Sequence, residues 1–386
     1  MNTSFSTTLL ATLSLANVLH AAFTGDAPDA HHPWAVHDTN RPQPPIVEPA
    51  AAVGGAPSDA VVLFDGSEAS FQQNWQHVKP QDKRKADWTV QDGYMLVVGG
   101  AGFLETQAEF GDCQLHVEWA HEGPMDAPGQ KRGNSGVFLP GGIEVQILDN
   151  YQNPSYADGS AGAVYGVMPP AANALRAPGQ WQSYDIIYRR PIVRDGVLLD
   201  EGSMTVLLNG VVVQASTPLD GGGGFRKRKP LTQVYPDKGR LKLQDHGNPV
   251  RYRNIWYREL RPRPADGGTD GRLSESATLA KRAEIAAQVR ASAEGLQGYA
   301  RMMRLLEAYV YDNDPVLWQE CDAAVLAYVQ QLQALSVDAL KQRRSAVVGL
   351  NQALSYLQRF AMVAADYVPA AQLQQVVDQQ GWGKRR

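Results

Sequence analysis

Residues 204–214 read MTVLLNGVVVQ, a pattern typical of a β-hairpin. Asn209-Gly210 accepts the positive φ angles of a type I′ turn, and β-branched and apolar residues flank the pair. Residues 114–119 (QLHVEW) alternate apolar and polar side chains, as a half-buried strand does. A last long strand, rich in Tyr, Arg and Trp, is predicted over residues 250–260. Strands at this density, with no helical pattern between them, predict a mainly β domain, a β-sandwich or jelly roll, over residues 60–262.

The pattern changes after residue 262. Prolines and glycines predict an exposed linker over residues 263–273. Asp314-Pro315 is typical of a helix N-cap followed by proline at the first helical position. Apolar residues now recur with a period of 3.6, at Leu279, Ala283, Ala286, Val289 and Ala293. Residues 274–386 are therefore predicted to form a smaller all-α bundle without a cofactor motif, for oligomer contact or for docking to a protein partner.

The N-terminus resembles a secretory signal peptide over residues 1–22. An apolar run at residues 9–19 is followed by His20-Ala21-Ala22, and it is too short to span a membrane. Residues 23–59 are rich in proline and alanine, which predicts a linker or a disordered tether. No other stretch approaches the ~20 apolar residues of a membrane span. We therefore expect a secreted or periplasmic protein with no membrane span.

Charge and cysteine content exclude several classes of function. The formal net charge is −4, from 36 basic and 40 acidic residues, and gives no attraction to nucleic acid or anionic lipid. The basic run at residues 226–229 follows four glycines and is interpreted as a solvated loop, with a phosphate or substrate-rim role as the alternative. Cys113 and Cys321 allow neither a zinc motif nor a disulfide framework. Cys113 is expected to be buried and Cys321 to lie on a helix face.

A first cluster of polar residues lies between residues 132 and 149. In a strand, Glu144 and Gln146 project from the same face, and Asp149 needs a bulge at the strand end to join them. Two carboxylates and an amide on one sheet face suit acid/base chemistry and sugar binding. The alternative is an ordinary half-exposed strand.

A second cluster lies between residues 241 and 256. Gln244 and His246 share a face there, as do Arg251 and Arg253. A single histidine is as often structural as functional, so both interpretations stay open. Neither cluster matches a phosphate-binding loop, a dinucleotide fingerprint, a serine nucleophile elbow or a zinc-protease helix.

A series of short motifs connects the two clusters. In chain order they are VLFDG (62–66), WTVQDG (88–93), FGDCQLHVEW (110–119), RGNSGVFL (132–139), EVQILD (144–149), GAVYG (162–166), PGQWQSYDI (178–186), LNGV (208–211), LQDHG (243–247) and RNIW (253–256). In order and spacing, this series resembles the 3-keto-disaccharide hydrolase domain family. The resemblance does not extend to the C-terminal helices.

The resemblance implies a concanavalin-like jelly roll whose concave face binds saccharide, and cleavage of glycosides already oxidised at C3. A 3-ketone acidifies the C2 proton, so a carboxylate can remove that proton and the C1 leaving group departs by elimination, after which water adds. The implied catalytic residues are Glu144, His246 and Asp149. Substrate contacts are expected from a wider set: Glu118, Asn134, Ser135, Gln146, Tyr165, Trp181, Gln244 and Arg253. No cofactor is certain, although a hard divalent metal ion held by Glu144 and His246 is compatible with this set.

The sequence departs from the family pattern at a few positions. The loop at residues 221–229 has four glycines and a basic run where the family usually has Gly-Pro-Thr, and Ala161 stands where a cysteine often precedes Gly162. Two other functions remain compatible with the sequence. One is a non-catalytic carbohydrate-binding module with a helical docking or oligomerisation domain. The other is hydrolysis of ordinary glucans, whose usual Glu-x-Asp-x-x-Glu strand here has Gln146 in place of the middle carboxylate.

Overall fold

The computed structural model describes residues 22–123, 126–233, 235–263 and 273–383. The chain divides into two compact units, Met1–Pro44 with Gly271–Arg386 (the helical unit) and Pro45–Asp270 (the β-unit). Residues 1–21 of the predicted signal peptide and residues 264–272 of the predicted linker lie outside the described residues. Export of the chain stays a prediction, which N-terminal sequencing of the native protein would test by a start near Ala22.

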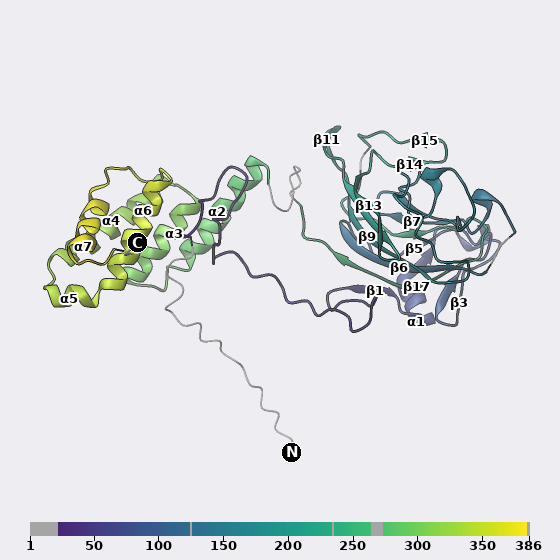
Figure 1. Cartoon of the computed structure of the whole chain (residues 1–386), viewed down its shortest axis with the longest axis horizontal. Helices are drawn as coiled ribbons and strands as arrows, with labels where there is room; N and C mark the ends of the chain where they lie inside the picture. Colours follow the sequence, from purple (N-terminus) through teal and green to yellow (C-terminus); the bar gives the residue numbers. More distant parts are fainter. Residues whose placement is uncertain (1–21, 124–125, 234, 264–272, 384–386) are drawn as a thin grey trace, which may run out of the picture. The chain divides into compact units, whose positions relative to one another are not determined.

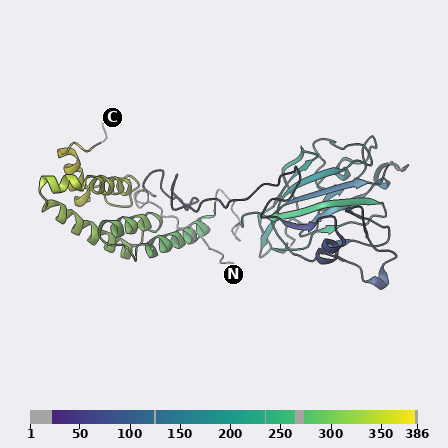
Figure 2. The same ribbon diagram turned by 90° about the horizontal axis from the view of Figure 1, so that it is seen from below.

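The β-unit is built from two antiparallel sheets (Figures 1 and 2). The larger sheet contains β1 (Val61–Phe64), β3 (Thr89–Gln91), β4 (Tyr94–Leu96), β6 (Cys113–His121), β9 (Gln182–Arg189), β12 (Ser203–Leu208), β13 (Val211–Pro218) and β17 (Val250–Glu259). The smaller sheet contains β2 (Trp75–His77), β5 (Leu104–Thr106), β7 (Ser135–Leu139), β8 (Ile143–Ile147) and β16 (Lys242–Leu243). The unit is completed by two two-stranded ribbons and one helix. The ribbons pair β10 (Ile192–Arg194) with β11 (Val197–Asp200), and β14 (Gly223–Gly224) with β15 (Lys227–Arg228); the helix is α1 (Glu68–Asn74).

The order of strands places distant segments side by side. The eight-stranded sheet has the order β13-β12-β9-β6-β17-β4-β3, with β1 also paired to β17, and the five-stranded sheet has the order β2-β5-β16-β7-β8. The predicted hairpin is confirmed as β12–β13, with Asn209 at φ 53° and Gly210 at φ 81°. Both angles lie in the left-handed region that a type I′ turn requires. The two-layer antiparallel sandwich confirms the predicted fold of this part of the chain.

The core of the β-unit lies between the two sheets. Leu115, Val117 and Trp119 of β6 are fully buried, as are Val137 of β7 and Val145 of β8. Burying each such side chain stabilises the fold by roughly 1.5–3 kcal/mol. Because strand residues alternate between the two faces, the polar residues between these positions lie on the outer face of their sheet. A site built on strand residues therefore belongs to the outer face of one sheet or of the other.

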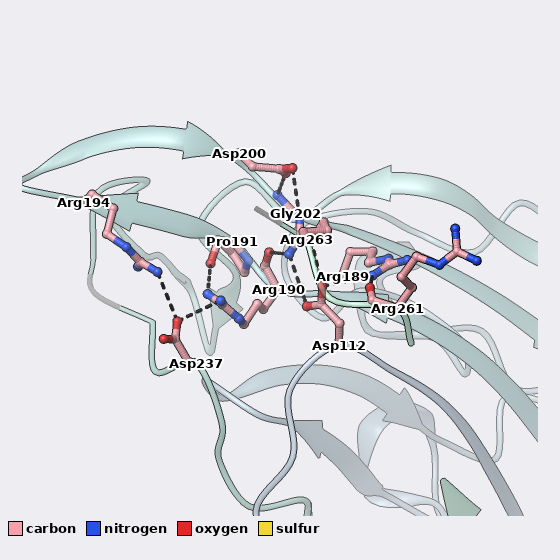
Figure 3. A network of polar contacts seen from close by, with 10 residues as sticks. All are labelled: Asp112, Arg189, Arg190, Pro191, Arg194, Asp200, Gly202, Asp237, Arg261 and Arg263. Atoms are coloured by element: carbon pink, nitrogen blue, oxygen red, sulfur yellow. Dashed lines mark hydrogen bonds and ion pairs between the residues drawn. The ribbon is translucent and has the colours of Figure 1, made fainter. Parts of the chain in front are cut away.

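The last described residues of the β-unit are held by ion pairs. The Arg263 guanidinium lies between two carboxylates (Figure 3), with Nε 2.7 Å from Asp112 Oδ2 and Nη1 2.8 Å from Asp200 Oδ2. It also donates to the Arg190 carbonyl oxygen at 2.5 Å, and its side chain is only 6% exposed. Arg263, predicted as the first residue of an exposed linker, is thus fixed to the sandwich.

The helical unit contains α2 (Glu275–Ala291), α3 (Gly298–Tyr311), α4 (Pro315–Gln333), α5 (Val337–Gln342), α6 (Arg344–Arg359) and α7 (Val368–Gln379). This confirms the predicted helical region. Asp314 caps α4 by accepting from the backbone N–H groups of Val316 and Leu317. Leu279 and Ala283, predicted to face the core, are both exposed, Leu279 to 57%, and Thr278 is buried instead. Among the described residues, no helix is both long and apolar enough to cross a bilayer.

Residues 22–59 make specific contacts, which a fully disordered tether would not. On the helical unit, the Trp34 ring packs edge-on against Tyr311, and Asn40 Nδ2 donates to Tyr311 Oη at 3.0 Å. On the β-unit, the carbonyl oxygen of Gly54 accepts from Trp256 Nε1 at 2.9 Å. The apolar rings in a proline-rich segment explain this ordering, because they bury area that the composition as a whole does not suggest.

Both cysteines are free and buried, Cys113 in the β-unit and Cys321 in the helical unit. Burial raises the pKa of each thiol, that of Cys321 to about 12. These thiols are therefore unreactive while their units are folded. The predicted burial of Cys113 is confirmed.

Candidate functional site

The outer face of the five-stranded sheet carries a cross-strand row of polar and aromatic side chains. The register pairs Glu144 with Phe138, Phe138 with Lys242, Lys242 with Glu105, and Glu105 with Gln76. The row therefore crosses all five strands, at about 4.8 Å per strand. Glu144, on the edge strand β8, and Glu105 are the two carboxylic acids in it.

Tyr165 extends this row beyond β8. Its backbone N–H donates to the carbonyl oxygen of Glu144 at 3.0 Å, and Val164 bridges to Val145. Val164 and Val145 are both fully buried, so alternation places Tyr165 and Glu144 on the outer face. Glu144 thus lies between two aromatic residues, Tyr165 on one side and Phe138 on the other.

The carboxyl group of Glu144 lies over Gly136 of the neighbouring strand. A Cβ at position 136 would come within 2.2 Å of Glu144 Oε1, so glycine is required there for the carboxyl group to lie flat against the sheet. Burial raises the pKa of Glu144 to about 8, against a smaller opposing effect from the charge of Lys229. A carboxyl group that titrates near neutral pH is well matched to general acid or base catalysis.

Lys229 was part of the basic run that the sequence indicated to be solvated. Its ammonium group instead donates to the carbonyl oxygen of Gly142 at 2.8 Å, and the side chain is half-buried. Burial lowers the pKa of Lys229, while the Glu144 carboxylate acts in the opposite direction. Lys229 is thus a positive charge beside the row, in contrast to the solvated loop that the sequence favoured; the substrate-rim alternative stays a prediction.

Amide side chains lie next to Glu144. Gln146 follows it on the same face of β8 and is 1% exposed, with Nε2 3.3 Å from both Asn134 Oδ1 and Gln130 Oε1. Gln244 comes from the segment after β16, where its backbone N–H donates to Gly136. Gln244 Oε1 is buried and has no hydrogen-bond partner among the described residues. An unpaired buried amide oxygen is costly, so it indicates a position at which a bound hydroxyl group would be stabilised.

Three of the predicted residues take other positions. Ser135 faces the core, where its hydroxyl donates to the Gln244 carbonyl oxygen at 2.6 Å and contacts Tyr252 Oη at 2.7 Å. Asp149 is 1% exposed and pairs with Arg132, whose Nε lies 3.0 Å from Oδ2. His246 is exposed in the turn after β16, and among the described residues no hydrogen bond or ion pair joins it to Glu144. The catalytic roles predicted for Asp149 and His246 stay predictions, without support from this geometry.

Glu118, Arg253 and Trp181 belong to the other sheet. Glu118 accepts from Arg253 Nε at 2.6 Å, and the Arg253 guanidinium lies 4.0 Å from the centre of the Trp181 ring. Leu115, Val117 and Trp119 of β6 point into the core, so Glu118 lies on the outer face of the eight-stranded sheet. The expectation that these three residues share one surface with Glu144 is therefore not met, because the core separates the two outer faces.

Two cavities border the row on either side of Glu144. One, of about 420 Å³, is lined by Tyr165 and by residues of the β14–β15 ribbon, and is termed the aromatic–basic pocket. The other, of about 570 Å³, is lined by Phe138, Lys242 and Glu105, and is termed the Phe138 pocket. Glu144 lines neither cavity itself, but the strand order places it between Tyr165, which lines the first, and Phe138, which lines the second.

Comparison with known proteins assigns a family to the β-unit. Residues 59–258, slightly over half of the chain, match the family described as the 3-keto-alpha-glucoside-1,2-lyase-like domain. The chain belongs to this family. A candidate glycosyl hydrolase of known structure from Parabacteroides distasonis is 41% identical, with a TM-score of 0.52, and the match covers 57% of this chain and 93% of that one. No curated protein matches the chain.

More distant structures also match this chain. Another candidate glycosyl hydrolase from Parabacteroides distasonis is 20% identical, with a TM-score of 0.38, covering 56% of this chain and 100% of that one. The alginate lyase Aly36B is 11% identical, with a TM-score of 0.33, covering 53% of this chain and 99% of that one. The family assignment confirms the predicted resemblance and places the β-unit among glycoside-cleaving, carbohydrate-active domains.

Among the described residues, no three His, Cys, Asp or Glu side chains come close enough together to hold a metal ion. Glu144 has the positive charge of Lys229 beside it, which disfavours a metal ion there, and His246 is exposed. We therefore derive no catalytic step through a metal.

Sequence reasoning missed Phe138, Lys242 and Lys229. The motif RGNSGVFL contains Phe138, but its position beside Glu144 follows from the pairing of β7 with β8, which no local pattern gives. Lys242 alternates with buried Leu243, and this alternation was the one signal that could have placed it on the polar face.

Proposed function

We propose that the β-unit cleaves 3-keto-glycosides, with Glu144 as the base that removes the C2 proton. The proposal is carried by one observation: a carboxyl group with a pKa raised to about 8 lies between two cavities on the outer face of one sheet. The 3-keto group makes the C2 proton acidic. A base with a pKa near the working pH binds a proton well and is still present in its unprotonated form.

The proposed reaction has three steps. The Glu144 carboxylate takes the C2 proton, and the electrons of the C–H bond form an enolate with its negative charge on the C3 oxygen. The enolate then expels the C1 substituent, which leaves as an alcohol after taking a proton. Water adds across the C1–C2 double bond of the enone and gives the free 3-keto sugar.

Nearby side chains supply what the enolate needs. Lys229 lies close enough to Glu144 for the two charges to interact, and it is suited to neutralise the C3 oxyanion. Gln146, Asn134 and Gln244 present amide groups to the sugar hydroxyls. This is the role that the sequence predicted for these three residues.

A direct test uses the full chain and a 3-keto-glucoside beside its parent glucoside. We expect cleavage of the 3-keto-glucoside alone, and exchange of its C2 proton with deuterated solvent. A parallel reaction with a chelator tests the metal-free mechanism, and we expect no change in rate. Sugar binding with neither cleavage nor exchange, with or without divalent metal, would support the carbohydrate-binding module instead.

The pKa of Glu144 gives the pH dependence a definite sign. Glu144 is protonated below a pH of about 8, so as a base it is inactive there. The value of kcat/KM should therefore increase about tenfold per pH unit below pH 8 and level off above it. The profile for Glu144→Gln should lose this rise. A wild-type profile that instead falls through pH 8 would assign Glu144 as the acid, contrary to the proposal.

A further inference from the structure

The aromatic–basic pocket has a wall that the proposed mechanism leaves unused. Its wall is the β14–β15 ribbon, whose two central residues are Phe225 and Arg226. The ribbon packs directly on the backbone beside Glu144, because a Cβ at Gly223 would approach the Tyr165 carbonyl oxygen to 1.9 Å. This close packing fixes the ribbon over Tyr165.

The pocket is strongly basic. Arg226, Lys227 and Arg228 all line it, and Asp158 is the one carboxylic acid among its lining residues. Arg228 is partly neutralised by Asp220, with Nη1 3.3 Å from Oδ2. Arg226 and Lys227 have no carboxylate partner among the described residues. Two cationic side chains are therefore available to an anion that enters the pocket.

The same pocket presents aromatic surface to solvent. Phe225 is 66% exposed and Tyr156 is 44% exposed. Tyr156 Oη lies 3.0 Å from Tyr165 Oη, so this second tyrosine connects the pocket with the row that contains Glu144. Exposed aromatic rings at a cavity rim provide a surface on which a flat ring can stack. The Arg226 guanidinium lies 5.0 Å from the centre of the Phe225 ring, so cationic and aromatic groups lie side by side at this pocket.

We propose that the aromatic–basic pocket binds a leaving group that is a flat ring bearing a carboxylate, an aromatic acid aglycone. The inference rests on the proposed function. A 3-keto-hexosyl group is neutral, and it offers no charge for which arginine and lysine would select. The cationic wall must therefore face the other half of the substrate, and the exposed rings favour a flat one. The sugar then lies toward the Phe138 pocket, and the glycosidic bond lies above Glu144.

The test compares two 3-keto-glucosides of equal size with the wild-type full chain. One carries a 4-carboxyphenyl aglycone and the other the neutral 4-carbamoylphenyl aglycone. Two exposed cations each contribute a few-fold to an ion pair, so we expect kcat/KM about tenfold higher for the carboxylate at low salt. The preference should decrease as salt is added, because exposed charges are screened.

Two double variants, matched in net charge, locate the effect. Arg226→Gln with Lys227→Gln should bring the preference to within about twofold, through a lower kcat/KM for the carboxylate substrate. Lys83→Gln with Lys85→Gln, which removes two exposed cations outside the pocket, should keep the preference. Equal kcat/KM for both substrates in the wild type would overturn the inference and leave the proposed function intact. Absence of cleavage and of C2 exchange with both would overturn the proposed function, and the inference with it.

Discussion

Replacing Glu144 with glutamine is expected to lower turnover of a 3-keto-glycoside by at least about 10²-fold, the low end of what a positioned base supplies. Glutamine keeps the shape of the side chain and its place over Gly136, so the fold should be preserved. Exchange of the C2 proton should stop as well, because this exchange requires the base and not the leaving group. Initial rates and deuterium incorporation on the same substrate measure both effects.

The same variant should show the cost of keeping a carboxyl group at this position. The folded-state pKa of Glu144 is raised from 4.5 to about 8, so the folded protein binds this proton more tightly than the unfolded chain does. The free energy of unfolding therefore decreases as pH rises from about 4.5 to about 8. The Glu144→Gln variant should not show this decrease in the free energy of unfolding, because glutamine does not titrate. We expect equal stability near pH 4 and a more stable variant above pH 8, as measured by urea unfolding at both pH values.

Glu105→Gln is the matched control for both measurements. Glu105 lies in the same row. Burial acts to raise its pKa, but its bonds to Gln76 and Lys242 outweigh burial and leave the pKa lowered. The control should keep turnover within a few-fold and should not gain stability at alkaline pH. An equal loss of turnover in both variants would show that the charge of the face matters, and not a base at Glu144.

The local part of the fold could be predicted because its signals are local. The turn at Asn209-Gly210 was predicted because these two residues accept the positive φ angles of a type I′ turn. The strand at residues 114–119 was predicted from the alternation of its side chains. For the same reason Glu144 and Gln146 were correctly predicted to share a face. These inferences need a few neighbouring residues and no knowledge of which strands pair.

The candidate site as a whole could not be predicted, because it depends on sheet membership. Glu118 alternates with buried neighbours as Glu144 does, yet the two belong to different sheets and lie on opposite sides of the core. The sequence pattern of neither strand indicates which sheet the strand joins. Lys229 could not be singled out for a different reason. It belongs to a run of four basic residues, and only the packing of the ribbon buries its side chain more than those of its neighbours.

Arg263→Ala is expected to destabilise the β-unit by about 3 kcal/mol, the lower end of what removing one partner of a buried ion pair costs. The substitution would remove a shared cationic partner from two carboxylates, because Asp112 and Asp200 both accept hydrogen bonds from the Arg263 guanidinium (Figure 3). Arg189 and the backbone N–H of Arg190 still contact Asp112, which limits the loss. The helical unit contains none of these partners, so its stability should not change.

The two buried cysteines allow the change in stability of each unit to be measured in the intact chain. Cys113 follows Asp112 in the β-unit, and Cys321 lies in the helical unit, so thiol labelling under native conditions reports the opening of each unit separately. A loss of 3 kcal/mol should increase the labelling rate of Cys113 on the order of 100-fold and leave Cys321 unchanged. Arg258→Ala is the control, because its pair with Asp59 is more exposed and should contribute about 1 kcal/mol or less. If Arg263→Ala labels Cys113 no faster than Arg258→Ala does, residue 263 belongs energetically to the linker, as the sequence alone indicated.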